Sequence, residues 1–239
     1  MYKVDSYKYQ KCTGPNKLKL FNTIYKARVW PESWKVAIII PIPKPSGEGL
    51  RPVSLLTCMS KVFELVIHKR LVYKLPQFEE AYGYMQGRGT ADAVVRFMDL
   101  ITSTRRQTKS KHSVAVFFDL SKAFERARRL EVIEALITVG IRGSLLAILD
   151  AWICNRKAKV RLQGFCTLEA ELECGVPQGS ILSPTVFNVL VEHMVNKAKA
   201  ISGVTVLTYA DDIVAIAHNN QPYATIQKCI NALNDSATS

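Results

Sequence analysis

The chain has 239 residues, of which 48% are hydrophobic and 22% are charged, and this composition is typical of a folded globular protein rather than a disordered one. No apolar stretch approaches the length of about 18 residues that a membrane span needs, and the polar N-terminus has no apolar signal-peptide core. Thirty-two Lys and Arg residues against 20 Asp and Glu give a net charge of +12, which favours nucleic acid or nucleotide as a partner.

The positive charge is concentrated in the first third of the chain. Residues 1–75 carry 14 basic and 4 acidic side chains, a net of +10, whereas residues 76–239 carry 18 and 16, a net of +2. This asymmetry predicts one polyanion-binding region in the N-terminal third. The alternative, a basic surface that is merely solvated, would have the same composition.

The predicted elements of the first half are mostly helices. The helical spacing of apolar residues predicts helices at Asn16–Val29, Ser60–Lys74 and about Thr90–Thr104. The β-branched run Val36–Ile40 predicts a strand. The segment Pro41–Pro52, which contains four prolines and two glycines, predicts a loop after that strand.

The second half mixes helices with short strands. Val114–Phe118 has the composition of a strand buried on both faces. Helices are expected at Leu130–Val139, Leu145–Ile153, Ser183–Lys199 and about Tyr223–Leu233. In the third of these, Ser183 is predicted to be the N-cap and Pro184 the first helical residue. Ala158–Leu162 and Ala170–Glu173 are expected to be hairpin strands with Gln163-Gly164 as the turn between them, and two further strands are expected at Val204–Thr208 and Ile213–Ala217. The mixture indicates an α+β fold with short antiparallel strands.

Three acidic residues stand at the ends of apolar strands. Asp119 follows Val114–Phe118, and Asp211 and Asp212 separate the last two predicted strands. Carboxylates beside such strands are costly to bury unless they pair or bind a metal ion. If the two strand ends lie side by side, their oxygens suit Mg²⁺ or Mn²⁺ in a site for phosphoryl transfer. The alternative is that Asp211-Asp212 is an ordinary polar turn.

Three further segments present residue types that bind ligands, and each has an ordinary structural alternative. The glycine-containing loop Gly175–Ser180 leads into a helix, whose free N–H groups, together with Gln178, suit a phosphate or a sugar. Lys44 and Arg51 lie in a loop that can fold over a triphosphate or can simply face solvent. Phe124 either presses against a nucleotide sugar or belongs to the core.

Taken together and in this order, these segments resemble the sequence motifs of reverse transcriptases. Motifs A, B and C of that family are similar to Phe118-Asp-Leu-Ser-Lys-Ala-Phe124, Gly175-Val-Pro-Gln-Gly-Ser-Ile-Leu-Ser-Pro184 and Tyr209-Ala-Asp-Asp212. Upstream, Lys35–Pro45 and Arg51–Leu56 look like fingers motifs 1 and 2, and Gly87–Ala93 looks like the fingers segment that follows them. The resemblance is to the reverse transcriptase domain of non-LTR (LINE-like) retrotransposons, and it covers about residues 30–217.

The resemblance implies a metal centre. Asp119 and Asp211 take the positions of the main metal ligands, Asp212 assists them, and these three are the expected catalytic residues. The backbone carbonyl of Leu120 would add one more oxygen ligand. The implied cofactor is a pair of Mg²⁺ ions, with Mn²⁺ as an alternative.

The resemblance also implies a nucleotide-binding set. Lys44 and Arg51 match the fingers residues that hold the triphosphate, and Gln178 and Gly179 match the loop that contacts the incoming nucleotide. Phe124 takes the place of the steric gate against a ribose 2′-OH. One departure is Glu125, which stands where an Asp commonly follows the gate residue.

The implied architecture is an α+β right-hand polymerase of fingers and palm, with an antiparallel palm sheet backed by helices and with the thumb missing. We expect an N-terminal extension at residues 1–29, fingers at 30–112 and palm at 113–239, with part of 128–174 returning to the fingers. The chain stops 27 residues after Asp212, before the positions of the family's motif D lysine and thumb, so we expect a copy truncated at the C-terminus. Because a palm without a thumb would hold primer and template weakly, we expect low activity of the isolated chain.

The implied function is an RNA-directed DNA polymerase that adds dNTPs to a primer 3′-OH by two-metal phosphoryl transfer during retrotransposition. The implied partners are an RNA template, a DNA primer or nicked target DNA, dNTPs, and the rest of an element polyprotein with endonuclease and thumb; no membrane is among them. The expected location is intracellular, in nucleus and cytoplasm. The alternatives are a truncated, non-catalytic nucleic-acid-binding remnant, and a maturase or telomerase-like polymerase. Phe124 argues against an RNA-templated RNA polymerase.

Overall fold

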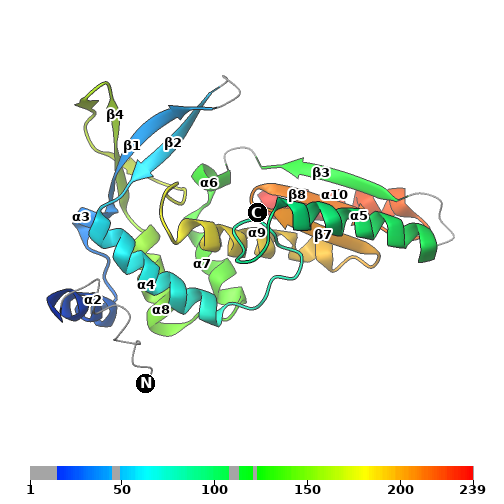
Figure 1. Ribbon diagram of the computed structural model, residues 1–239, viewed down its shortest axis with the longest axis horizontal. Helices are drawn as coiled ribbons and strands as arrows, with labels where there is room; N and C mark the ends of the chain where they lie inside the picture. The colour runs from blue at the N-terminus through cyan, green and yellow to red at the C-terminus, as the bar shows by residue number, and fades with distance from the viewer. Residues whose placement is uncertain (1–14, 45–48, 108–112, 121–122, 239) are drawn as a thin grey trace.

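A computed structural model describes residues 15–44, 49–107, 113–120 and 123–238. Two sheets lie at opposite ends of the molecule, with helices between and beneath them (Figure 1). The helices are α2 (Pro15–Ala27), α3 (Glu32–Lys35), α4 (Cys58–Lys74), α5 (Thr90–Gln107), α6 (Ala123–Arg126), α7 (Arg129–Thr138), α8 (Gly143–Ile153), α9 (Ser183–Lys199) and α10 (Pro222–Thr238). The strands are β1 (Val36–Pro43), β2 (Leu50–Leu55), β3 (Val114–Asp119), β4 (Arg156–Leu162), β5 (Phe165–Cys166), β6 (Ala170–Leu172), β7 (Val204–Tyr209) and β8 (Asp212–Ala217). This composition confirms the predicted α+β class.

The first sheet has the strand order β2-β1-β4-β5, and β6 also pairs with β4. β1 runs antiparallel to β2 and parallel to β4, so strands from two distant parts of the chain, β1 and β2 on one side and β4 to β6 on the other, build one sheet. The prediction of a loop over Pro41–Pro52 is wrong at both ends, because β1 continues to Pro43 and β2 begins at Leu50, while residues 45–48 of that segment lie outside the described residues. Pro41 pairs with Pro52 in an edge hairpin, and the β4 pairing of β1 ends at Ile39. The prolines therefore lie where their missing N–H groups interrupt no second ladder.

The second sheet has the order β3-β8-β7, and all its pairs are antiparallel. Helices α9 and α10 cover one face, while α5 packs near β7 on the other (Figure 1). The prediction that Val114–Phe118 is buried on both faces is wrong, because β3 is an edge strand and Phe117 is 69% exposed. Val116 and Phe118 pack into the core beneath the sheet, whereas α5 lies too close to β7 to cover Phe117 fully.

The largest core lies among the helices between the two sheets. Its fully buried side chains include Trp30, Phe63, Ile148 and Trp152. The Trp30 and Phe63 rings lie 5.2 Å apart, and this contact fastens the segment before α3 to α4. In the part of the chain that is described, no helix combines the length and apolar character that crossing a membrane requires.

Most predicted helices are confirmed, with two differences of detail. α10 continues beyond Leu233 to Thr238. Ser183 is not the N-cap of α9, because Leu182 holds that position and the Ser183 hydroxyl donates to the Pro177 carbonyl. β4 and β6 pair as the predicted hairpin strands, but the Gln163-Gly164 turn joins β4 to the short strand β5 rather than directly to β6.

Candidate active site

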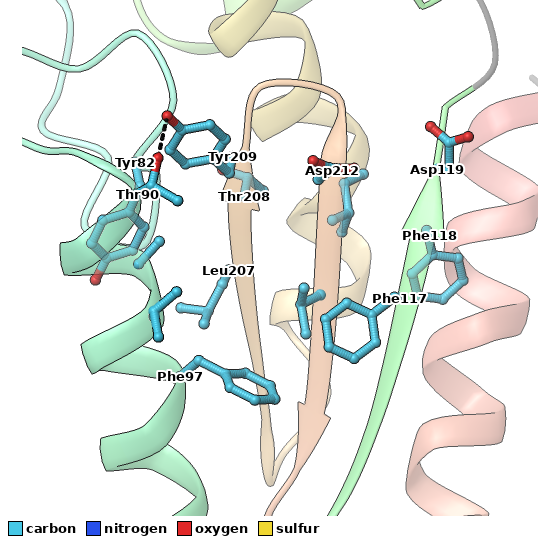
Figure 2. A pocket seen from close by; sticks show the side chains of 14 residues that line it. Tyr82, Thr90, Phe97, Phe117, Phe118, Asp119, Leu207, Thr208, Tyr209 and Asp212 are labelled. Carbon is cyan, nitrogen blue, oxygen red and sulfur yellow. Dashed lines mark hydrogen bonds between the residues drawn. The ribbon is translucent and has the colours of Figure 1, made fainter. Parts of the chain in front are cut away.

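Asp119 and Asp212 lie opposite each other on neighbouring strands. The two residues are register partners at the ends of β3 and β8. Because side chains alternate along a strand, Asp119 shares a face with Ala115, and Asp212 shares a face with Val214. Both Ala115 and Val214 pack toward α5, so the two carboxylates share the face away from α9 and α10. Figure 2 shows them at the same end of the sheet.

Asp211 lies in the tight turn between β7 and β8. Tyr209 and Asp212 are register partners, so only Ala210 and Asp211 connect the two strands. Burial raises the pKa of Asp212, and the negative charges of Asp211 and Asp119 raise it further. The three predicted catalytic carboxylates thus act on one another electrostatically, with Asp212 rather than Asp211 directly opposite Asp119. Over the described ranges, no three His, Cys, Asp or Glu side chains form a ready cluster for a metal ion.

Leu120 follows the last residue of β3, and its half-buried side chain packs against the core beneath the sheet. This anchor fixes the chain directly after Asp119. The strand end that carries the Asp119 carboxylate is therefore held by the packing of Leu120 on the opposite face of the sheet.

The segment before α5 locks the β7–β8 turn in place. The Tyr82 N–H donates to the Thr208 carbonyl, and the Thr208 N–H donates to the Glu80 carbonyl, both at 2.9 Å. Gly83 lies so close to the turn that a Cβ on it would be 2.2 Å from the backbone nitrogen of Ala210. The sequence carries no visible sign of this contact, because it joins residues that are more than 120 positions apart.

Arg88 stabilises the same segment. Its guanidinium donates to the carbonyls of Phe78, Glu79 and Ala81 at 2.6–2.8 Å. Three charge-assisted hydrogen bonds from one side chain fold this segment into a compact loop. Within the Gly87–Ala93 segment, Arg88 therefore stabilises the loop that precedes α5.

The Gly175–Ser180 loop packs directly against β2. The Ser54 N–H donates to the Gln178 carbonyl at 2.7 Å. Gly179 has φ +109°, and a Cβ on it would lie 2.7 Å from the Ser54 carbonyl oxygen. Only glycine fits both the backbone conformation and the close approach. The predicted nucleotide-binding residues Gln178 and Gly179 are therefore held beside the strand that carries Arg51.

The same loop is tied to the segment that carries Phe124. The Val176 N–H donates to the Phe124 carbonyl, and the Gly175 N–H donates to the Ala127 carbonyl, both at 2.8 Å. The Gln178 side-chain amide donates to the Glu125 carboxylate at 2.8 Å. Glu125, which departs from the expected Asp, is thus a direct partner of the loop.

Glu64 is a functional candidate that the sequence reasoning missed. It is fully buried on α4 and accepts hydrogen bonds from the Ser180 hydroxyl at 2.6 Å, the Ile181 N–H at 2.8 Å and the Ser60 hydroxyl at 3.2 Å. It also faces the charge of Arg156, whose pKa burial lowers to about 10 against the opposing effect of Glu64. The available signal was its helical spacing with the buried positions Ser60 and Ile67.

Arg51 and Lys44 lie at the end of the β1–β2 hairpin where the chain passes from β1 to β2. Arg51 pairs with Ile42, and Lys44 follows the last paired residue of β1, with its N–H donating to the Gly49 carbonyl at 3.1 Å. Both side chains are exposed. Arg51 acts on the site electrostatically: burial and the charge of Asp211 raise the pKa of Tyr84, and Arg51 opposes that shift.

An open, mostly apolar cleft of about 520 Å³ adjoins the carboxylates. Asp119 and Asp212 stand at one end of it, and Phe97, Phe117 and Leu207 lie along its walls (Figure 2). The Thr90 hydroxyl donates to the Tyr209 hydroxyl at 3.0 Å and fastens α5 beside the cleft. The arrangement suits a ligand that presents a positively charged group to the carboxylate end.

Comparisons with known proteins agree with the motifs. The family model described as "Reverse transcriptase (RNA-dependent DNA polymerase)" matches residues 42–239. The chain is 28% identical over 218 residues to a probable RNA-directed DNA polymerase from transposon BS of Drosophila melanogaster, covering 84% of this chain and 23% of the relative. It is 27% identical to the RNA-directed DNA polymerase from mobile element jockey of Drosophila funebris, covering 82% of this chain and 23% of the relative. The chain therefore spans less than a quarter of the length of these curated relatives.

Solved structures share the fold. The apo telomerase from Candida tropicalis truncated from its C-terminal domain superposes with a TM-score of 0.64 at 15% identity, over 90% of this chain and 51% of that chain. Telomerase from Candida tropicalis in complex with a fragment of telomeric RNA gives a TM-score of 0.63 at 14% identity, over 92% and 42% of the two chains. These likenesses confirm the predicted polymerase fold with its antiparallel sheet backed by helices.

Proposed function

We propose that this chain, which belongs to the reverse transcriptase (RNA-dependent DNA polymerase) family, supplies the fingers and palm of an RNA-directed DNA polymerase of a non-LTR retrotransposon. Residues 30–112 would form the fingers and 113–239 the palm, and β4 to β6 would belong to the fingers sheet that they join. Residues 1–29 would precede the fingers as an extension.

The observation that carries the proposal is the register of Asp119 with Asp212 beside the turn that holds Asp211. Reverse transcriptases generally use divalent metal ions, and the donor set fits them, because carboxylate oxygens are the ligands that such ions prefer and a cation would offset the like charges of Asp119 and Asp211 that raise the pKa of Asp212. Asp119, Asp211, Asp212 and the Leu120 carbonyl would hold two Mg²⁺ ions, or Mn²⁺. When bound, such ions neutralise the charge that develops on the attacking and leaving oxygens.

The chain's own residues would orient the nucleotide. Arg51 and Lys44 would hold the triphosphate through charge-assisted hydrogen bonds. Gln178 and Gly179, which rest against Ser54, would contact the nucleotide from the loop before α9. Phe124 would lie against the sugar and exclude a 2′-OH. Catalysis here is mainly positioning together with electrostatic stabilisation.

The partners would be an RNA template, a DNA primer or nicked target DNA, and dNTPs. The net charge of +10 over residues 1–75 supports binding of the nucleic-acid backbone near the fingers. The curated relatives are several times longer than this chain, and a thumb and an endonuclease in the rest of such a polyprotein would complete the machinery.

Primer extension tests the proposal. The chain receives an RNA template with an annealed DNA primer, Mg²⁺ and dNTPs, beside the Asp211→Ala/Asp212→Ala variant. We expect extension by the wild-type chain that falls at least about 100-fold in the variant, because the proposed centre loses two of its three carboxylates. The matched control is Glu134→Ala, an exposed acid on α7, which keeps wild-type extension.

Absence of extension by the wild-type chain, with salt-sensitive binding of the same duplex retained, would contradict catalysis by this chain. That result would favour the alternative of a non-catalytic nucleic-acid-binding remnant. Extension that survives in the double variant would contradict the assignment of the carboxylates.

A further inference from the structure

Two non-glycine residues with left-handed backbone meet at the site. Tyr84 has φ 57° and Ala210 has φ 55°, a region that side chains with a Cβ adopt at a cost of about 1–3 kcal/mol each. Gly83, the residue before Tyr84, touches the Ala210 backbone, since a Cβ on it would strike the Ala210 nitrogen. Such strain persists only where the surroundings fix the backbone, and it is common at sites that position a ligand.

The surroundings of Tyr84 do fix it. The Gly83 carbonyl accepts a buried hydrogen bond from the Asn188 side-chain amide of α9 at 2.7 Å. On the other side, the Tyr82 N–H donates to Thr208 in β7. The residues that precede Tyr84 are thus bound both to α9 and to the second sheet, so its side chain has a defined direction.

That direction leads to Phe124. The Tyr84 and Phe124 rings are perpendicular, at 88°, with centroids 6.2 Å apart. The Phe187 ring, which is buried on α9, stacks on Phe124 at 4.3 Å and 19°. Phe124 is therefore held by one ring from α9 and by a second from the loop that carries Tyr84.

α6 is a single turn with no buried residue, and Phe124 on it is half-buried and packs against both neighbouring cores, to which Phe187 and Tyr84 add their ring contacts. A ring excludes a 2′-OH only if it cannot shift away, and displacements of about 1 Å are large on the scale that matters at such sites. Phe187 restrains the ring across its face, and Tyr84 is the neighbour that restrains it from the perpendicular direction. Tyr84 is 54% exposed, so its ring is not part of the hydrophobic core and contacts Phe124 from the solvent side.

We propose that Tyr84 is a positioning residue that fixes the Phe124 ring beneath the sugar of the incoming nucleotide and thereby sets the preference for deoxyribonucleotides. The inference rests on the proposed function. It assigns the effect to the aromatic ring of Tyr84 and not to its hydroxyl, because the ring makes the contact with Phe124.

The test compares equilibrium dissociation constants of dATP and ATP, which differ only in the 2′-OH, on the full chain with Mg²⁺ and a primer–template whose primer lacks its 3′-OH, so that the bound nucleotide is not incorporated. Tyr84→Gly is the informative variant, because glycine accepts φ 57° without strain and the loop stays folded. We expect the ATP-to-dATP ratio of dissociation constants to fall about three- to ten-fold, the size of one aromatic pair contact. Tyr84→Phe keeps the wild-type ratio, and Tyr73→Ala, an exposed tyrosine on α4, is the matched control.

Phe124→Ala separates this inference from the proposed function. We expect Phe124→Ala to lower the ratio at least as far, and Tyr84→Gly added to it to lower the ratio no further, because both act through one ring. A wild-type ratio in Tyr84→Gly beside a lowered ratio in Phe124→Ala would overturn the role of Tyr84 and leave the proposed function standing. A wild-type ratio in Phe124→Ala, or no preference for dATP in the wild-type chain, would contradict the proposed gate itself.

Discussion

Glu64 is the residue on which the geometry of the loop before α9 depends. Its carboxylate is shielded from solvent and accepts from Ser180 and Ile181, so it holds the end of the loop whose other residues touch β2 and Phe124. Removal of this carboxylate is costly in folding free energy, because it leaves three hydrogen-bond donors without their acceptor and leaves the buried Arg156 without the nearby negative charge.

Glu64→Ala should therefore lower the free energy of unfolding by about 3–5 kcal/mol. Glu64→Gln, which keeps the shape but removes the charge beside Arg156, should fall between Ala and wild type. Urea unfolding followed by circular dichroism measures both, with the exposed Glu134→Ala as control, for which we expect a change within about 0.5 kcal/mol. A loss below about 1 kcal/mol in Glu64→Ala would show that the loop is held by other contacts.

Single residues differ in how far the sequence could predict them. Asp119 and Asp212 were predictable, because carboxylates at the ends of apolar strands are unusual and the strands themselves are local features. Tyr84 was not, because its backbone angle and its contact with Phe124 arise only when a loop, α6 and α9 come together. Phe117 was misjudged because an apolar run does not reveal which face of a strand a neighbouring helix leaves open.

At the scale of elements, the loop before α9 and β2 are fitted to each other. Gly179 approaches Ser54 so closely that a side chain there would clash with the Ser54 backbone. Unlike a side chain, backbone cannot relieve the clash by changing rotamer. Gly140, after α7, has a similar left-handed backbone, φ +88°, but open space where a Cβ would be. Substitutions at the two glycines therefore separate the free-energy cost of a left-handed backbone, present at both, from the cost of a steric clash, present only at Gly179.

Gly140→Ala should cost about 1 kcal/mol in unfolding free energy, and Gly179→Ala at least about 1–3 kcal/mol more. Because the extra displacement falls on Gln178 and on β2, Gly179→Ala should also weaken dNTP binding, while Gly140→Ala should not. Urea titration and equilibrium nucleotide binding measure the two effects. Equal stability losses in the two variants would contradict the close packing of loop and strand.

Helices were predicted more completely than sheets, and the reason is physical. Helical hydrogen bonds are local, so the periodicity of Ser60–Lys74 or Ser183–Lys199 was enough to place α4 and α9. The pairing of β1 with β4 joins residues far apart in the chain, and no local pattern encodes it. The Pro41–Pro52 pair shows the same limit, because prolines indicate a loop unless the edge position of the hairpin is known.

For the molecule as a whole, the uneven charge predicts where nucleic acid binds. Binding of an RNA–DNA duplex should weaken by about 100-fold between 50 and 200 mM salt if about four phosphates are neutralised. Lys19→Gln/Lys26→Gln on α2 should reduce the slope of log affinity against log salt by about two. Lys197→Gln/Lys228→Gln, which removes the same charge from exposed positions in the near-neutral remainder, should leave the slope unchanged. Equal effects of the two pairs would show that the basic N-terminal third is not the binding region.

The parallel pairing of β1 with β4 also has a consequence for biosynthesis. β4 begins about 120 residues after β1, which is about 6–24 s of synthesis at 5–20 residues per second. During that interval a nascent chain on the ribosome displays β1 with one edge unpaired, and such an edge is a template for aggregation. The hairpin with β2 closes only one side of β1. Completion of the sheet that carries Arg51 must therefore wait for translation to pass residue 172, and chaperones that shield strand edges would act on this chain before that point.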